Sequence, residues 1–346
     1  MKIGILSQSM GRNYGGILQQ YALSKYLESL GHNVIILNRQ PNNGGVFKRA
    51  IVQCLKHIGV KRYQTSDSKE GNIDQFIKRE FIISKPLLSG SSFSKECKKE
   101  HLNAVIYGSD QIWRRAFELR YGLDYFGAST PLSIRQIAYA PSFGLDVWEY
   151  TAKETANIKK TLNNFHSISS REESGVKLIS DYLGMEASLV CDPTMLLEEE
   201  HYEKLTTSQS PQSSYCFVYW LGDKESMNSA INDYNNRGEK NEIIAINLRD
   251  RKELPGIEQW LGYIRNAEYV ITDSFHGTVF AILFKKQFEV HCNKSGGYGR
   301  IQTLLGQLGL TEKLSDLQAP VDYSKVDDAV MAFRHHSQDY LTKALQ

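Results

Sequence analysis

The sequence predicts an α/β protein made of two successive halves, each with its own parallel sheet. Short apolar segments alternate with amphipathic helical segments up to about residue 197, and the same alternation restarts near residue 215. Polar residues directly follow several of the apolar segments, as expected where strands end at the binding edge of a parallel sheet. The 346 residues also exceed what one core usually organises. We therefore expect two Rossmann-like domains that face a cleft.

The boundaries of these domains follow from changes in composition. The expected N-terminal domain covers residues 1–200, and the expected C-terminal domain covers residues 215–315. Between them, residues 198–214 are rich in charge and then in Ser, Thr and Gln, which is typical of a linker. The last segment, residues 320–346, is predicted as a helix that packs back on the N-terminal domain.

Composition excludes several classes of protein. Lys and Arg number 41 against 39 Asp and Glu, so the formal charge of +2 argues against nucleic-acid binding across the whole surface. The five cysteines form no CxxC pair, which argues against a disulfide framework and a zinc site. The amino terminus lacks the pattern of a signal peptide, and the longest apolar segment, residues 277–284, is far shorter than the roughly 20 residues that cross a bilayer.

One segment of the chain, residues 46–62, is markedly basic. An ordinary solvated surface and a patch that contacts phospholipid both fit it, and the solvated surface is favoured. We therefore expect a cytoplasmic protein with peripheral contact at the inner face of the membrane left open. The basic residues are Lys48, Arg49, Lys56, Lys61 and Arg62.

The N-terminal half begins with a β-loop-α-β unit. Its glycines do not match GxGxxG, so a dinucleotide site is not predicted. The elements expected in this unit are a strand at 2–9, a loop at 11–16, a helix at 17–32 and a strand at 33–40. Further along, we expect a helix around 72–81, a strand at 104–107, a strand before 140–144, a strand into 169–171 and a last strand within 188–197.

The C-terminal half repeats the alternation. The elements expected here are a strand at 215–222, helix at 225–236, strand at 242–250, helix at 256–267, strand at 269–271, helix from about 277, strand at 288–293, helix at 301–310 and a final helix from about 325. A glycine-rich loop at 294–300 precedes the helix that carries Arg300. Arg300 is expected on the same side of the sheet as the residues that follow strand 269–271.

The stretch from Tyr269 to Val290 contains the main candidate residues for a functional site. An apolar strand breaks into the polar sequence TDSFHG and resumes as an apolar helix, so Ser274 and His276 stand at a helix N-terminus. Unpaired amides and the helix dipole favour an anion there, and a histidine beside an anion is a common catalytic arrangement. A turn histidine that only hydrogen-bonds backbone fits the same pattern equally well.

Two polar residues at strand ends of the first half are further candidates. Asp110 stands where a site carboxylate would lie, and equally where a helix N-cap would lie. Arg171 follows a strand and is placed to bind a carboxylate or phosphate with its guanidinium. The alternative for Arg171 is a salt bridge with Glu172 or Glu173.

Six segments of the chain share a pattern with one known family: GRNYGGILQQYAL, VIYGSDQIW, IAYAPSFG, ISSREESGVKLI, VCDPTMLL and YVITDSFHGTVFAILF. In this order they resemble the polysaccharide pyruvyl transferase family. The resemblance runs from the first strand to about Leu310, and it rests on the whole ordered set. The resemblance implies a fold similar to GT-B glycosyltransferases. It also implies transfer of a pyruvyl group from phosphoenolpyruvate to a sugar hydroxyl or diol, giving a pyruvate ketal on a capsule or exopolysaccharide or on its lipid-linked precursor.

The resemblance also implies roles for individual residues. The family commonly has an arginine two residues before its histidine, where this chain has Ser274. Arg171 matches a donor-binding arginine of the family, and Arg300 and Arg249 are candidates to supply the charge absent at Ser274. His276 is the expected general acid or base, because its ordinary pKa lies near neutral pH.

The remaining assignments complete the expected site. Asp273 is expected to orient His276, and Asp110 is the third catalytic candidate. No metal or cofactor is expected, with phosphoenolpyruvate as co-substrate, and His335 and His336 are assigned to solvent or packing. The further donor-site residues are Ser274, Gly277 and Thr278, and the acceptor-site residues are Asn13, Tyr14, Gly15, Gln19 and Ser142.

Two other functions fit the same sequence. A GT-B glycosyltransferase that uses a nucleotide sugar would hold its diphosphate in the same interdomain cleft, because one fold serves several chemistries. A sugar-binding component of polysaccharide assembly without catalytic activity is suggested by Ser274 alone. Expected partners are therefore phosphoenolpyruvate and a sugar acceptor, most simply a lipid-linked oligosaccharide, and not nucleic acid.

Overall fold

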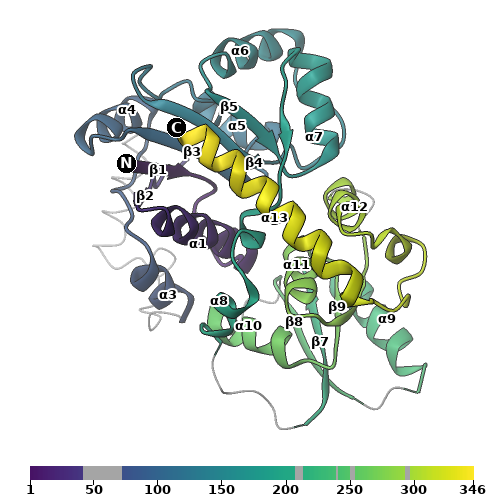
Figure 1. Ribbon diagram of the computed structural model, residues 1–346. Helices are drawn as coiled ribbons and strands as arrows, with labels where there is room; N and C mark the ends of the chain where they lie inside the picture. The colour runs from purple at the N-terminus through teal and green to yellow at the C-terminus, as the bar shows by residue number, and fades with distance from the viewer. Residues whose placement is uncertain (42–71, 207–212, 239–240, 250–253, 293–296) are drawn as a thin grey trace, which may run out of the picture.

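Two parallel β-sheets, each flanked by helices, form the body of the protein (Figure 1). The computed structural model describes residues 1–41, 72–206, 213–238, 241–249, 254–292 and 297–346. Within them, the first sheet has the strand order β2-β1-β3-β4-β5-β6 and the second has the order β10-β9-β7-β8. The predicted pair of Rossmann-like units is therefore confirmed. The basic segment 46–62 lies outside the described residues, so its interpretation stays a prediction.

In the first sheet, the position expected for a ligand is the crevice at the carboxyl ends of β1 and β3. The chain leaves β1 for β2 on one side and returns to β3 on the other, so the loops that follow β1 and β3 lie next to each other. Its strands are β1 (Lys2–Leu6), β2 (Asn33–Ile36), β3 (Ala104–Asp110), β4 (Arg135–Pro141), β5 (Ser167–Ser170) and β6 (Ser188–Leu189). Its helices are α1 (Tyr14–Ser29), α3 (Asn72–Glu80), α4 (Gly90–Lys99), α5 (Arg115–Tyr121), α6 (Ala152–Leu162) and α7 (Glu173–Leu178).

The second sheet has the same kind of switch between β7 and β9. The chain passes from β7 to β8 on one side and then to β9 on the other, so the turns after β7 and β9 share one edge. Its strands are β7 (Tyr215–Trp220), β8 (Glu242–Asn247), β9 (Tyr269–Thr272) and β10 (Gln287–Val290). Its helices are α9 (Lys224–Asn235), α10 (Ile257–Asn266), α11 (Phe275–Leu283), α12 (Tyr298–Gln307) and α13 (Tyr323–Leu345).

Helix α1 begins three residues earlier than predicted. The side chain of Asn13 accepts hydrogen bonds from the amides of Gly15 and Gly16, so it caps the helix and draws both glycines into its first turn. The predicted loop at 11–16 is therefore shorter. The error arose because glycine usually opposes helix, and here the cap outweighs that preference.

The segment at 198–214 is not a plain linker. Its first residues form helix α8 (Glu199–Glu203), and Tyr202 of this helix is buried and donates a hydrogen bond to the carbonyl of Thr194. Arg265 of α10 pairs with Glu203 at 2.6 Å. The connection is thus anchored to both halves of the chain.

The two halves share one continuous hydrophobic core. Tyr14, at the start of α1, stacks on Trp260 of α10 with ring centroids 5.0 Å apart and planes 9° from parallel. Its hydroxyl donates a hydrogen bond to the carbonyl of Pro255 at 2.8 Å. Both rings are fully buried, so the first turn of α1 belongs to the second half as much as to the first.

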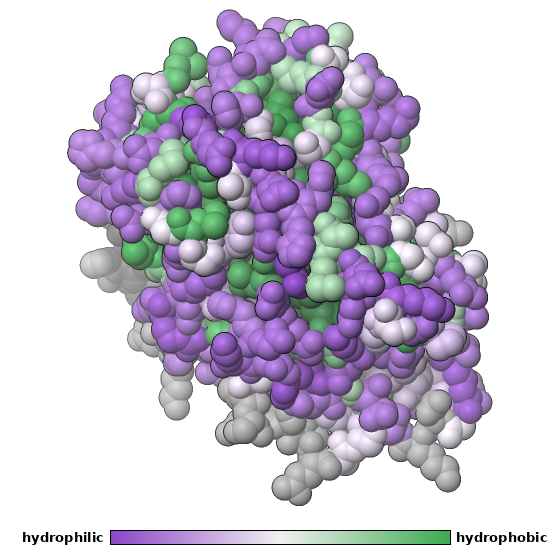
Figure 2. All heavy atoms as spheres, viewed as in Figure 1, coloured by the Kyte–Doolittle hydropathy of each residue, from purple (hydrophilic) through white to green (hydrophobic). Residues whose placement is uncertain are grey.

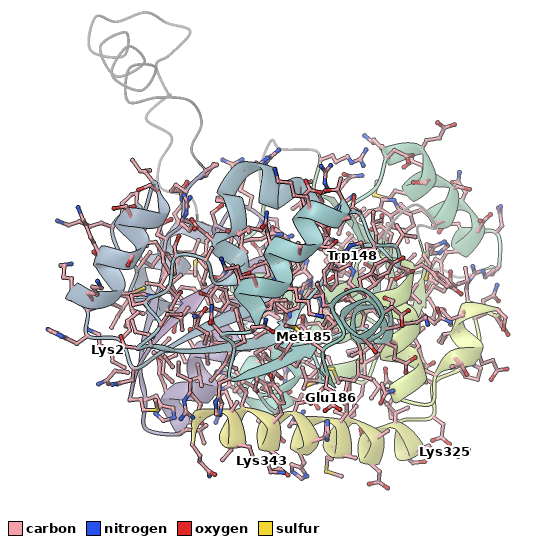
Figure 3. The ribbon with its side chains drawn as sticks, turned by 90° about the horizontal axis from the view of Figure 1, so that it is seen from above. Lys2, Trp148, Met185, Glu186, Lys325 and Lys343 are labelled. Atoms are coloured by element: carbon pink, nitrogen blue, oxygen red, sulfur yellow. The ribbon has the colours of Figure 1, made fainter. Side chains whose placement is uncertain are left out.

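Helix α13 runs across both units (Figures 1 and 3). Near its start, Tyr323 donates hydrogen bonds to the carbonyls of Ala281 and Lys286 in the second half. Towards its end, Tyr340 donates to the carbonyl of Ala138 in β4 of the first sheet. The face that α13 crosses is mostly hydrophilic in the space-filling view, with apolar side chains visible beside the helix (Figure 2). The helix thus braces the two units.

No helix in the described part of the chain combines the length and the apolar character that a bilayer span requires.

Removing the ring that joins the halves should weaken the whole fold. We expect Trp260→Ala to lower the free energy of unfolding by about 3–5 kcal/mol, because it leaves a large cavity beside Tyr14. Leu132→Ala, at a side chain that is 79% exposed, should change it by less than about 0.5 kcal/mol. Chemical denaturation followed by circular dichroism measures both, and equal midpoints for the two variants would contradict the shared core.

Candidate active site

A pocket of about 240 Å³ lies where the binding edges of the two sheets face each other. The first half contributes the cap of α1 and the end of β3. The second half contributes the turns after β7, β8 and β9 and the first turn of α12. The lining residues are Asn13, Asp110, Gln111, Leu221, Gly222, Arg249, Asp273, Ser274, Phe275, His276, Gly297, Arg300 and Ile301.

His276 is held between the two halves. It stands in the first turn of α11 and is 7% exposed, and its ring lies against Gly15 in the first turn of α1. A Cβ atom built on Gly15 would lie 2.0 Å from His276 Nδ1, so glycine is required at that position for the imidazole to fit. Two helix N-termini, those of α1 and α11, therefore meet at this histidine.

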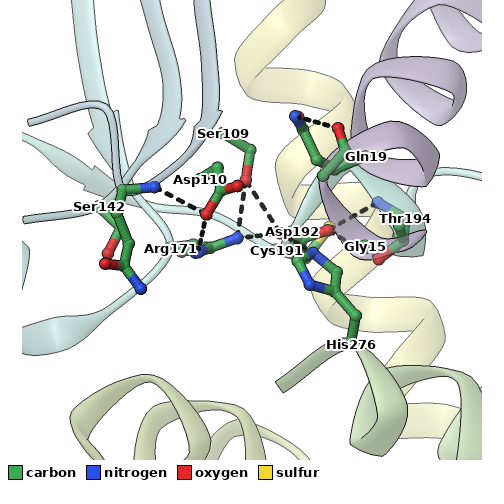
Figure 4. A network of polar contacts seen from close by, with 12 residues as sticks. Gly15, Gln19, Ser109, Asp110, Ser142, Arg171, Cys191, Asp192, Thr194 and His276 are labelled. Atoms are coloured by element: carbon green, nitrogen blue, oxygen red, sulfur yellow. Dashed lines mark hydrogen bonds and ion pairs between the residues drawn. The ribbon is translucent and has the colours of Figure 1, made fainter. Parts of the chain in front are cut away.

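Asp192 is the buried carboxylate that faces His276 (Figure 4). It follows β6, and its Oδ2 lies 3.6 Å from His276 Nε2 and 2.6 Å from Arg171 Nη1. The hydroxyl of Ser109 also donates a hydrogen bond to Oδ2, while Oδ1 accepts from the amide and hydroxyl of Thr194. One carboxylate thus connects the histidine of the second half to the arginine of the first.

The charge of this carboxylate is well stabilised. Burial by itself would raise the pKa of Asp192, but His276 and Arg171 outweigh burial and hold that pKa far below its usual range. For Arg171, burial alone would lower the pKa, whereas Asp192, Asp110 and Glu172 together raise it. Both groups are therefore ionised at neutral pH. A salt bridge with Glu172 alone does not describe Arg171. Its nearest carboxylate is that of Asp192, at 2.6 Å, whereas Glu172 lies 3.9 Å away.

Arg171 and Arg300 approach each other beside one aromatic ring. The guanidinium carbon of Arg171 lies 4.8 Å from the ring centroid of Phe275, and that of Arg300 lies 5.9 Å from it. Burial, and then the charge of Arg171, lower the pKa of Arg300. Phe275 therefore helps to hold two cations that repel each other.

Several buried polar atoms here have no hydrogen-bond partner among the described residues. They are Arg171 Nε and Nη2, Arg300 Nε, His276 Nε2 and Glu172 Oε2. Burial raises the pKa of Glu172, whose other carboxylate oxygen accepts a hydrogen bond from the amide of Phe143. A buried donor without a hydrogen bond lowers the stability of the folded state. Several such donors at one place are therefore typical of a ligand-binding site. Three of the four unpaired donors belong to guanidinium groups, which favours an anion.

The amides at the start of α11 differ from those predicted. The Gly277 amide donates to the hydroxyl of Ser274, and the Thr278 amide donates to the carbonyl of Ser274. The expectation that Gly277 and Thr278 bind the donor through their amides is therefore wrong. Ser274 is the helix cap and takes up these groups itself. The amides of Phe275 and His276, which precede these two in the same first turn, have no partner among the described residues.

Asp273 does not orient His276. Its two carboxylate oxygens accept hydrogen bonds from the amides of Leu221 and Gly222, which fixes the turn after β7. The prediction for Asp273 is corrected in this respect, because its carboxylate is directed at the turn after β7 and not at the imidazole. Asp273 still lines the pocket, and the carboxylate that faces the histidine is Asp192.

Asp110 and Arg249 both lie at the pocket. Asp110 ends β3 with a positive φ of 77°, an uncommon conformation for a residue other than glycine, and it is not a helix cap. Its Oδ1 lies 3.6 Å from Arg171 Nη2. Arg249 is exposed at the rim, where its Nε donates to the carbonyl of Leu221. Its guanidinium is therefore at the mouth of the pocket and not at the buried cluster.

The predicted acceptor residues separate into two groups. Asn13 lines the pocket, and Gly15 adjoins His276. The other three are wrong as pocket residues, because their side chains are used in the interior. Tyr14 is part of the interdomain stack, Gln19 donates to the hydroxyl of Ser7, and Ser142 accepts from the amide of Gly144.

Sequence reasoning missed three residues of the site: Asp192, Glu172 and Phe275. Asp192 follows β6 by three residues and comes directly after the apolar residues Val190 and Cys191, a position similar to that of Asp110 and Arg171, so it could have been found. The roles of Glu172 and Phe275 depend on contacts with Arg171 and Arg300, which no spacing in the sequence reveals.

Adjacent glycines in α1 offer a test of how His276 is held. Gly15→Ala should displace the imidazole from Asp192 and destabilise the protein by about 1–3 kcal/mol through overpacking. Gly16→Ala meets only ordinary contacts at 3.6 Å and beyond, so it should leave His276 in place. Histidine ¹H–¹⁵N spectra measure the difference, and an unchanged His276 signal in Gly15→Ala would contradict the packing.

Asp192 should be important for stability as well. Asp192→Asn leaves Arg171 buried without its closest charged partner. We therefore expect this variant to have a free energy of unfolding about 3–5 kcal/mol lower than that of the wild type at neutral pH. Because the pKa of Asp192 is lower in the folded state, its contribution is present above about pH 4 and is lost as the pH falls further. The gap between the wild type and Asp192→Asn should therefore narrow in acid.

Denaturation at several pH values measures this gap. Asp223→Asn is the control, since Asp223 is an exposed cap of α9 and asparagine caps about as well. A constant gap across the pH range would contradict the assignment.

Comparison with solved structures gives proteins of similar span and low identity. The UDP-GlcNAc 2-epimerase of Methanocaldococcus jannaschii, in complex with UDP-GlcNAc and UDP, is 12% identical, with 97% of this chain and 100% of that chain covered and a TM-score of 0.46. A glycosyltransferase from Rickettsia africae is 11% identical, with 99% and 95% covered and a TM-score of 0.48. Anabaena Alr3699/HepE, in complex with UDP and glucose, is 10% identical, with 99% and 100% covered and a TM-score of 0.49.

The family comparison is more specific. No match was found among curated proteins. The sequence model of the polysaccharide pyruvyl transferases matches residues 13–288, which include the cap of α1, Asp110, Arg171, Asp192 and His276. This range covers most of the chain, and the family is one of transferases that act on polysaccharide. The protein therefore belongs to the polysaccharide pyruvyl transferase family.

Proposed function

We propose that the protein transfers a pyruvyl group from phosphoenolpyruvate to a sugar diol, forming a pyruvate ketal on a surface polysaccharide or its lipid-linked precursor. The observation that supports this most directly is the group of unpaired, buried guanidinium atoms of Arg171 and Arg300 next to His276. Phosphoenolpyruvate carries a carboxylate and a phosphate, and guanidinium groups bind both through paired hydrogen bonds.

The donor would be held by groups from both halves of the chain. Arg171 and Arg300 offer unpaired N–H groups, and the amides of Phe275 and His276 add the positive end of α11. Arg249 at the rim would hold the more exposed anionic group. Ser274 would act through the position of α11 and not through charge, because its hydroxyl already accepts from Gly277.

The chemistry needs a proton at the methylene carbon of phosphoenolpyruvate. Protonation there leaves a cationic C2, which a sugar hydroxyl attacks with loss of its proton. The bond from C2 to the phosphate oxygen then breaks and inorganic phosphate leaves. A second sugar hydroxyl adds to C2 and closes the ketal, and the departing phosphate takes up its proton. In this proposal His276 carries the proton, and the carboxylate of Asp192 lies 3.6 Å from its Nε2. Asp110, across the pocket on β3, would accept the proton of the attacking hydroxyl, with Asn13 beside it to bind the sugar.

A variant of the histidine tests the proposal. His276→Gln should reduce kcat by about 10²–10⁴-fold while phosphoenolpyruvate still raises the melting temperature, because the variant removes proton transfer and leaves both arginines. The assay measures phosphate release together with the mass of the sugar acceptor. His336→Gln, at an exposed position on α13, is the matched control and should keep full activity.

Three results would count against the proposal, and the first and third of them would favour the other two functions. Stabilisation of the protein by UDP-sugars but not by phosphoenolpyruvate would favour a glycosyltransferase. Binding of phosphoenolpyruvate and acceptor with ketal formation unaffected by His276→Gln would remove His276 from the chemistry. No product with any acceptor, together with sugar binding, would favour a non-catalytic component.

A further inference from the structure

A second hollow, of about 280 Å³, lies beside the catalytic pocket in the first half of the chain. It is formed between one face of α7, with the π-helical turn that continues it over Ile179–Leu183, and the loop that follows β4. We call it the α7 groove. Its lining residues are Asp146, Val147, Trp148, Ser174, Lys177, Leu178, Asp181 and Tyr182.

Two stacked aromatic rings form the wall of the α7 groove. Trp148 and Tyr182 lie with centroids 5.0 Å apart and planes 6° from parallel. Tyr182 is 51% exposed and Val147 is 62% exposed, which are large fractions for apolar side chains in a folded protein. The π-helical turn carries Tyr182 to this position, and such turns recur at functional sites.

The rim of the α7 groove is polar and close to neutral. Lys177 pairs with Asp181 at 3.1 Å, and Asp146 adds a further carboxylate. The hydroxyl of Ser174 is buried in the lining and has no hydrogen-bond partner among the described residues. These groups suit hydroxyls that both donate and accept, and the extra carboxylate disfavours an anion.

The α7 groove and the catalytic pocket lie on either side of the first turn of α12. Asp146 is in close contact with Gly299, since a Cβ there would lie 2.2 Å from Asp146 Oδ1, while the neighbouring Arg300 lines the catalytic pocket. The amide of Glu173 in α7 also donates a hydrogen bond to Thr303 of α12. In Figure 3, Trp148 is set well back from α13, so this side of the molecule is not covered by that helix.

We propose that the α7 groove binds a neutral sugar ring of the acceptor, at least one residue away from the diol that reacts. Aromatic faces bury the apolar face of a sugar ring, and the polar rim takes up its hydroxyls. This inference rests on the proposed function for the identity of the chain as an acceptor. It deepens that function by requiring an acceptor longer than a monosaccharide.

Intrinsic fluorescence provides a direct test with lactose, cellobiose and chitobiose, each compared with its monosaccharide. Of the four tryptophans, Trp113, Trp220 and Trp260 are buried, so Trp148 is the one that a ligand in the groove would reach. We expect at least one disaccharide to change the emission and to bind about three- to tenfold more weakly to Tyr182→Ala. Ile82→Ser, at a residue that is 72% exposed and not among those lining the groove, should bind as the wild type does.

The outcomes separate this inference from the proposed function. If no sugar changes the emission of the wild type, or if Tyr182→Ala binds equally well, the α7 groove is not a sugar site, whatever the catalytic assay gives. If sugar binding depends on Tyr182 but phosphoenolpyruvate neither binds nor reacts, the α7 groove is a sugar site and the proposed pyruvyl transfer is wrong. In the ketal assay, Tyr182→Ala should raise KM for a disaccharide acceptor and leave kcat unchanged.

Discussion

The contact of Asp192 with both Arg171 and His276 is the interaction on which the site depends. It joins a histidine at the start of α11 to an arginine at the end of β5, and so ties the two halves at their facing edges. Two charges can remain in so buried a place only if each compensates the other and further hydrogen bonds satisfy the carboxylate. Ser109 and Thr194 supply those hydrogen bonds. The site is therefore organised before any ligand arrives.

Helix α1 provides the second connection between the halves. Its first turn places Tyr14 in the core of the second half and Gly15 against the imidazole of His276. These two neighbouring residues, Tyr14 with its large ring and Gly15 without a side chain, thus fix the distance between the units. Helix α13 braces the same arrangement from outside with hydrogen bonds to both units. Proton transfer by His276, as proposed, would benefit from this rigidity, because small displacements of a catalytic group are costly.

Arg171 and Arg300 place two positive charges close together at the site. Arg171 has carboxylate partners, yet two of its nitrogens form no hydrogen bond within the described part of the chain, and the same is true of Arg300 Nε. Phe275 lies against both guanidiniums and offsets part of their repulsion. An anion between them would satisfy the donors and relieve the repulsion together. The α7 groove, with its near-neutral rim, has the opposite character, which suits a different part of the substrates.

The sequence by itself determined the two parallel sheets, their strands and the family, because apolar periodicity and ordered motifs are local properties of the chain. It also singled out Asp110 and Arg171, since polar residues directly after strands share one edge of a parallel sheet, and His276 and Arg300 in the first turns of two helices. Only the tertiary structure decided that Asp192 and not Asp273 faces His276, that Ser274 takes up the Gly277 and Thr278 amides, and that Tyr14 packs in the core. The direction of a side chain in a turn, and the residue it meets from another part of the chain, depend on packing that no local pattern records.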